Sequence, residues 1–167
     1  SSLAKLKLID FTSVKGIGEA KAITLMAALE LGRRRRLSDT IVRSELTSSK
    51  DAYDLMKPLL EDLEIEQFWV IYLNNANKVL VKSKISQGGM TATVVDVRLI
   101  LKEALKLNAT GLILCHNHPS GTLKASKADQ VVTDKVKAAA SLMDIQLLDH
   151  IIVTDQSYFS FADLGRI

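Results

Sequence analysis

Residues 111–121 of this 167-residue chain read GLILCHNHPSG, a short apolar run that leads directly into two histidines and a turn. The apolar half has the length and character of a buried strand. Residues i and i+2 of an extended chain project to the same side, so His116 and His118 can face one point. Pro119 and Gly121 then predict a sharp turn into a polar loop.

A carboxylate is expected to return to these histidines from the next helix. Ser126 and Asp129 stand at the start of a helix that the sequence predicts over 127–143. Two imidazoles and one carboxylate suit zinc, and three protein ligands leave a fourth coordination position for water. We therefore expect a catalytic-type site with one Zn²⁺ per chain, held by His116, His118 and Asp129.

Each part of this pattern also has a purely structural interpretation. Ser126 and Asp129 are the residue types favoured at a helix N-terminus, as cap and as first-turn acid. His118, which precedes a proline, fits a loop, and His116 fits a hydrogen-bonded core histidine. The combined spacing His-x-His-x7-Ser-x2-Asp favours the metal site over these separate explanations.

The rest of the chain alternates between predicted helices and strands. We expect a polar loop over 116–125, a β-hairpin turn at Asn74–Asn77 and a helix cap at Ser48-Ser49. The remaining predicted elements are helices near 50–63 and 94–107 and strands at 68–73, 78–86, 111–115 and 146–153. This alternation predicts an α/β (α+β) domain in which helices flank a mixed sheet.

The first 36 residues carry an excess of positive charge. They hold eight Lys and Arg against three acids, whereas the remainder holds 14 basic and 16 acidic residues. Such asymmetry indicates an anionic partner for the N-terminal part. A short helix around Leu6 and Ile9, a turn at Gly16-Ile17-Gly18 and a long helix over 19–35 form a predicted helical hairpin.

Composition excludes several classes of protein. The chain is 47% hydrophobic and 25% charged, as globular proteins are, and no uncharged apolar run is long enough to span a membrane. One cysteine, Cys115, excludes internal disulfides and Cys-rich zinc ribbons, and it is expected in the core of a cytoplasmic protein. The start, Ser1-Ser2-Leu3, is neither a signal peptide nor a natural initiator, so we expect a fragment of a longer protein.

The spacing His-x-His-x7-Ser-x2-Asp resembles the JAMM, or MPN+, metalloprotease motif. The wording of residues 116–121, with Leu148-Asp149-His150 downstream, is similar to the bacterial RadC family. The resemblance covers about 48–167 and implies a cytidine-deaminase-like MPN/JAB fold with a zinc-dependent peptidase or isopeptidase site. It implies a helical segment at 1–38, a linker at 39–47 and the catalytic-type domain at 48–167.

The resemblance also implies roles for single residues. The three expected zinc ligands match those of the motif, and Ser126 matches the residue that supports the oxyanion. Glu66 matches the general base, with Glu61 and Glu64 as neighbouring alternatives; it is otherwise one of several solvated acids. Zinc would activate water, Glu66 would move its proton to the leaving amine, and Ser126 would donate to the oxyanion. His150 is expected to be structural, because the ligand set is complete without it.

The N-terminal segment resembles the helix-hairpin-helix portion of the same family, whose glycines let backbone N–H groups approach a phosphate at a helix N-terminus. Alternatives are a protein-docking module or a packing turn for the hairpin, and a solvated helix end for the arginine run. Such contacts to phosphates would bind DNA independently of its base sequence. The candidate phosphate-binding residues are Lys15, Gly16, Gly18, Lys21, Arg33, Arg34, Arg35 and Arg36.

Two functions follow from these expectations. The first is a zinc-dependent hydrolase of JAMM type that acts on an unidentified protein or peptide. The second is a DNA-binding accessory protein, related to repair or recombination, whose metal site is vestigial or structural. A zinc deaminase is disfavoured, because it requires a His-x-Glu segment and a Cys-x-x-Cys pair that a chain with one cysteine does not have.

Overall fold

The computed structural model describes residues 7–41, 45–88 and 95–167, and in the first of these ranges it describes side chains as far as residue 34. From α3 onward, single helices are separated by one or two strands. In chain order the elements are α1 (Leu8–Thr12), α2 (Glu19–Ile41), α3 (Ser49–Leu60), β1 (Gln67–Leu73), β2 (Val79–Gln87), α4 (Val97–Lys106), β3 (Gly111–Asn117), α5 (Lys127–Ser141), β4 (Gln146–Val153) and β5 (Tyr158–Ser160).

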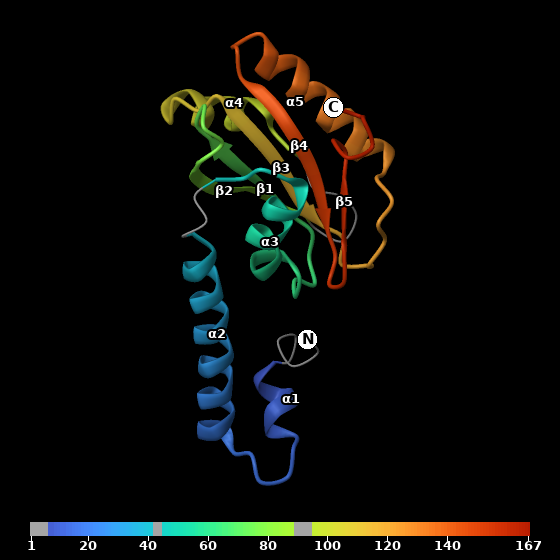
Figure 1. Ribbon diagram of the computed structural model, residues 1–167. Helices are drawn as coiled ribbons and strands as arrows, with labels where there is room; N and C mark the ends of the chain where they lie inside the picture. The colour runs from blue at the N-terminus through green and yellow to red at the C-terminus, as the bar shows by residue number, and fades with distance from the viewer. Residues whose placement is uncertain (1–6, 42–44, 89–94) are drawn as a thin grey trace.

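The strands form a mixed sheet in the order β2-β1-β3-β4-β5 (Figure 1). β3 and β4 are parallel, and the other neighbouring pairs are antiparallel. α3 packs on one face of the sheet, whereas α4 and α5 pack on the other. The predicted class, α/β with a mixed sheet flanked by helices, is confirmed.

β3 is the central strand, and it is buried along its whole length. Leu112 and Leu114 belong to the core cluster that includes α4 and α5. Ile113 and Cys115 belong to the cluster on the α3 side. Because both faces are covered, the strand is apolar without alternation until its last two residues. Cys115 is therefore a core residue, as predicted.

The crossover from β3 to β4 runs through α5 and sets the start of that helix beside the carboxyl end of β3. Parallel neighbours require such a crossover. Asn117 ends β3, where it pairs with Val153, and Lys127 begins α5. His116 on the strand and Asp129 in the first turn of the helix are thereby brought close together.

α2 is longer than predicted. The sequence predicts a helix over 19–35 and a linker over 39–47, but α2 runs to Ile41. Arg and Leu are strong helix formers, so the helix continues through residues that show no apolar period. Residues 42–44 of the predicted linker lie outside the described residues.

β3 is also longer than predicted, because His116 and Asn117 pair with Ile152 and Val153 of β4. The loop expected over 116–125 therefore begins after the strand ends. β5 has only three residues, too few for a periodic pattern, and the sequence does not predict it. In the described part of the chain, no helix combines the length and the apolar character needed to cross a membrane.

Candidate metal centre

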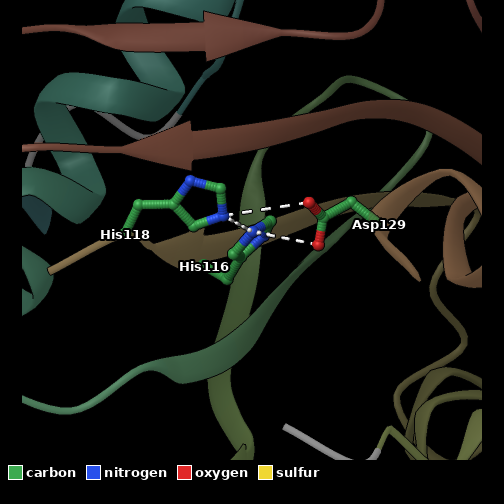
Figure 2. A group of neighbouring side chains, drawn as sticks. All are labelled: His116, His118 and Asp129. Atoms are coloured by element: carbon green, nitrogen blue, oxygen red, sulfur yellow. Dashed lines mark hydrogen bonds and ion pairs between the residues drawn. The ribbon is translucent and has the colours of Figure 1, made fainter. Parts of the chain in front are cut away.

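Two imidazoles and one carboxylate converge at the carboxyl end of β3 (Figure 2). The Nε2 atoms of His116 and His118 are 3.0 Å apart. Asp129 places Oδ1 3.3 Å from Nε2 of His116, and Oδ2 3.8 Å from Nε2 of His118. His116 is fully buried and Asp129 is nearly so, whereas His118 borders solvent. The structure thus brings the three predicted ligands together in a group that could hold a metal ion.

A tight turn sets the orientation of the His118 ring. The Gly121 N–H donates to the His118 carbonyl at 2.9 Å, and Gly121 has a φ of 75°. This is the predicted turn: Pro119 is its second residue, and Gly121, its fourth, has a left-handed backbone conformation. It brings the Thr122 carbonyl to 2.7 Å from Nδ1 of His118. A carbonyl only accepts, so Nδ1 carries the proton and Nε2 of the neutral ring has a lone pair.

A chain of hydrogen bonds fixes the tautomer of His116. The Thr133 hydroxyl donates to the Asp129 carbonyl at 2.6 Å, so its oxygen accepts from Nδ1 of His150, also at 2.6 Å. Nε2 of His150 then accepts from Nδ1 of His116 at 2.9 Å. The lone pair of His116 is left on Nε2, which faces the other two ligands. Contacts of this kind orient metal-binding histidines.

Aromatic rings support the histidines. Phe68 of β1 stacks on His116, with ring centroids 5.9 Å apart and 11° between the planes. Phe161 stacks on His150 at 4.9 Å and 13°. His150 therefore lies behind a ligand rather than among the ligand atoms, in agreement with the structural position expected for it.

Ser126 and Asp129 form a capping box at the N-terminus of α5. The Ser126 N–H donates to Oδ2 of Asp129 at 2.6 Å, and the Asp129 N–H donates to Oγ of Ser126 at 3.1 Å. The structural interpretation of this pair is correct, and it is compatible with metal binding, because the cap holds the carboxylate beside the histidines. Oγ of Ser126 acts only as an acceptor in the cap, so its hydroxyl proton can be donated to another group.

Burial keeps two of the three histidines neutral. It lowers the pKa of His116 to about 4, although the Asp129 carboxylate raises it. It holds the pKa of His150 well below its usual value, and the neighbouring His116 and His118 lower that pKa further. The neutral imidazole is the form that binds a metal ion.

Glu66 lies immediately before β1 and is partly buried. It stands two residues before Phe68, which pairs with His116 in the sheet. Its carbonyl accepts the N–H of Gly88 at 2.9 Å. Its main chain is therefore part of the sheet end that carries the three candidate ligands.

The two alternative acids lie beside lysines. Glu61 is 3.7 Å from the Lys57 ammonium at the end of α3. Glu64 is 3.7 Å from the Lys7 ammonium, and its side chain is 62% exposed. Each of these two carboxylates, which precede β1 in the chain, therefore has a lysine partner.

The predicted DNA-binding glycines lie in the turn between α1 and α2 (Figure 1). Gly16 has a φ of 92°, and its carbonyl accepts from the Lys21 ammonium at 3.1 Å. The Gly18 carbonyl accepts the N–H of Ala22 in the first turn of α2. Lys15 is exposed at the tip. The hairpin geometry is thus present, with Lys21 engaged in closing the turn.

The arginine run is partly neutralised within α2. Arg33 and Arg34 each donate to Glu30 at 2.8 Å. Hydrogen bonds from these guanidinium groups lower the pKa of Glu30 to about 2. The side chains of Arg35 and Arg36 lie outside the described residues. For Arg33 and Arg34, this pairing favours the solvated helix end over a phosphate contact.

Sequence reasoning missed Thr133 and Asn117. Thr133 follows Asp129 by four residues on α5, a spacing that places both on one helix face, and this signal was present in the sequence. Asn117 lies between the two histidines, but its hydrogen-bond partners, Ile65 and Gln67, come from another strand. No pattern among the neighbouring residues predicts these two hydrogen bonds.

Comparison with known proteins places the chain in a family. The model of the RadC-like JAB domain matches residues 46–166. A UPF0758 protein of Flavobacterium johnsoniae is 51% identical over 165 residues, which cover 99% of this chain and 72% of that protein. UPF0758 proteins of Porphyromonas gingivalis and Staphylococcus haemolyticus are 44% and 38% identical, over 99% and 98% of this chain and 74% and 72% of their own lengths. These relatives are bacterial, and the matched family model defines a JAB-type domain. The chain belongs to the RadC family.

We expect the metal-free protein to lose stability as the pH falls from about 6.5 to about 4. In that range an unfolded histidine takes up a proton that native His116 and His150 do not, which costs up to about 1.4 kcal/mol per pH unit for each. Asp149 acts in the opposite direction, because burial raises its pKa. Urea unfolding followed by Trp69 fluorescence measures the change, and a His116 ring that titrates near 6.5 by NMR would contradict it.

Proposed function

We propose that this chain is a zinc-dependent hydrolase of JAMM type that cleaves a peptide or isopeptide bond. The observation that carries the proposal is the convergence of two imidazole nitrogens, 3.0 Å apart, with a carboxylate whose two oxygens lie 3.3 Å from His116 and 3.8 Å from His118. The hydrogen-bonded nitrogens of both rings are turned away from this group. The family supplies the class of domain. The chemistry is inferred from the residues of the site.

The donor set and its spacing fit zinc. A tetrahedral zinc ion with bonds of about 2.0–2.1 Å separates its ligand atoms by about 3.4 Å. The two imidazole nitrogens are 3.0 Å apart, and one atom from each of the three residues lies within 4.8 Å of the other two, so small side-chain shifts would bring all three to that spacing. Two imidazole nitrogens and one carboxylate are the donors of a catalytic zinc, whereas calcium and magnesium prefer oxygen alone.

Each side chain of the site then has a defined task. The chemistry that zinc supplies when bound is Lewis acidity, which makes water a nucleophile at neutral pH and polarises a carbonyl oxygen. Glu66 accepts the proton of the attacking water and delivers it to the leaving amine. The Ser126 hydroxyl donates to the oxyanion that develops on the scissile carbonyl. Burial of His116 excludes solvent from the inner side of the site.

Sheet register supports Glu66 as the base. Residues 66 and 68 of an extended chain project to the same face, and Phe68 stacks on His116. That face carries the ligand group. Phe68 and His116 are the last pair of this ladder, so Glu66 lies two residues beyond it, at the end of the sheet where His118 follows β3.

The purified protein should contain about one zinc ion per chain. His118→Ala and Asp129→Ala each remove one of three ligands, so each should lower zinc affinity by at least about a hundredfold. Asp134→Ala, at an exposed position on the same helix, is the matched control and should bind zinc normally. Metal analysis and chelator competition measure both quantities. Wild-type affinity in the two ligand variants would exclude this site.

Glu66→Gln should keep the zinc, the fold and the substrate affinity while turnover falls by about 10²–10⁴-fold, because an amide cannot accept the proton. The measurement is an unbiased search of peptide and isopeptide substrates with the wild-type chain, repeated with the variant. Glu64→Gln is the control and should retain activity. Normal hydrolysis by zinc-loaded Glu66→Gln would assign the base to another residue, and loss of activity in Glu64→Gln would identify that residue as Glu64.

A second candidate function, DNA binding by a RadC-type accessory protein, is favoured by the hairpin between α1 and α2. Gly16 has the left-handed conformation that this turn requires, and Lys15 is exposed beside it. The start of α2 follows directly, and helix N-termini attract phosphate. The pairing of Arg33 and Arg34 with Glu30 reduces the charge that the rest of α2 offers.

If the segment binds DNA through phosphates, affinity should fall steeply with salt and depend little on sequence. Replacement of Arg35 and Arg36 by alanine should reduce the salt slope, by about one for each phosphate that is no longer neutralised, whereas Arg33 and Arg34 are already paired with Glu30. Lys135→Ala with Lys137→Ala, two exposed changes on α5, controls for net charge. Fluorescence anisotropy with duplexes of two unrelated sequences measures the slope. Salt-independent binding, or none, would favour the docking module.

A further inference from the structure

Asn117 is buried between the two histidine ligands, with 2% of its surface exposed. Its Oδ1 accepts the N–H of Gln67 at 2.7 Å, and its Nδ2 donates to the carbonyl of Ile65 at 3.2 Å. These peptide groups stand immediately before and after Glu66. One amide side chain therefore clamps the main chain on both sides of the proposed base.

The clamp replaces bonds that the sheet cannot make there. The register that pairs Phe68 with His116 would set Ile65 opposite Pro119 if it continued. Proline has no N–H, so the Ile65 carbonyl would lose its partner on β3. The Asn117 amide supplies both a donor and an acceptor at this point, which an ionised carboxylate cannot do.

Glu66 is held from the opposite side as well. Its own carbonyl accepts the N–H of Gly88, just beyond the end of β2, at 2.9 Å. The N–H and C=O groups of successive residues in an extended chain point to opposite neighbours, so Ile65 and Gln67 bond on the β3 side and Glu66 on the β2 side. The main chain at Glu66 is fixed between two strands.

We propose that Asn117 is a positioning residue that holds Glu66 at its working place beside the metal centre. The proposal rests on the proposed function, because it takes Glu66 as the base. Asn117 is bonded in the chain to His116 on one side and to His118 on the other. Its hydrogen bonds to the main chain around Glu66 therefore fix the base relative to both ligands. Displacement of a catalytic group by about 1 Å can cost on the order of a hundredfold in rate.

Acetohydroxamate is a suitable probe, because hydroxamates coordinate zinc through two oxygens and share a proton with a neighbouring carboxylate. Calorimetry on the zinc-loaded chain compares wild type, Glu66→Gln, Asn117→Leu and the double variant. Glu66→Gln should weaken binding roughly tenfold to a hundredfold, the contribution of a hydrogen bond to a charged group. Asn117→Leu should weaken it comparably, and the double variant should bind no worse than Glu66→Gln. Zinc content should stay at one per chain in all four proteins.

Asn74→Leu is the matched control. Asn74 follows β1 at its other end, and its side chain also makes two hydrogen bonds to the main chain, because its Oδ1 accepts the N–H groups of Ala76 and Lys78. This change removes two side-chain-to-backbone bonds from the turn at the opposite end of β1. It should lower stability but leave the affinity for acetohydroxamate unchanged.

The outcomes separate the two proposals. Zinc-loaded Asn117→Leu that binds acetohydroxamate like wild type, while Glu66→Gln does not, overturns the positioning role and leaves the hydrolase intact. If Glu66→Gln itself binds normally, Glu66 is not the base and the positioning role fails with it. An additive double variant would show that Asn117 acts independently of Glu66, which also overturns the proposal. Asn117→Ala, which adds no branched carbon, provides the same test if the leucine variant does not fold.

Discussion

The two imidazoles at the end of β3 face each other through their Nε2 atoms. Nδ1 of His118 donates to a carbonyl and Nδ1 of His116 donates to His150, so in the neutral form of each ring an Nε2 lone pair points into a gap of 3.0 Å. Lone pairs at that distance repel unless a cation or an additional proton lies between them. Contacts with the surrounding turn, helix and strand must therefore hold the two rings in this orientation.

Each ligand is held by a contact outside the ligand group. The turn after Pro119 fixes His118, and the capping box of α5 fixes Asp129. α5 also carries Thr133, which completes the hydrogen-bond chain to His116. A single helix therefore provides a ligand, the cap that orients it and the hydroxyl that sets the tautomer of another ligand. Its position follows from the parallel pairing of β3 with β4, which requires a crossover helix.

The sequence predicted the ligand group well because its members share one strand–turn–helix segment. Spacing along an extended strand and along the first turn of a helix is local geometry, which residue order determines. The contacts of Asn117 were not predictable, because they join residues about fifty positions apart through the sheet register. The sequence did not predict the three-residue β5 or the extension of α2 to Ile41 for a different reason. Neither segment has a periodic pattern of apolar residues.

Sheet register is also what connects the motif to its proposed base. Side chains alternate between the faces of a strand, so a slip of one residue between β1 and β3 would turn residue 66 away from the ligand group. The apolar residues of β1 resist such a slip along the strand, because both of its faces are packed. At the strand's first residues that packing ends, and the Asn117 clamp and the Gly88 bond take over. The candidate metal ligands come from the β3–α5 segment alone, whereas the proposed base comes from the segment before β1. In the proposed hydrolase, the register of that separate strand therefore makes residues 65–67 part of the site.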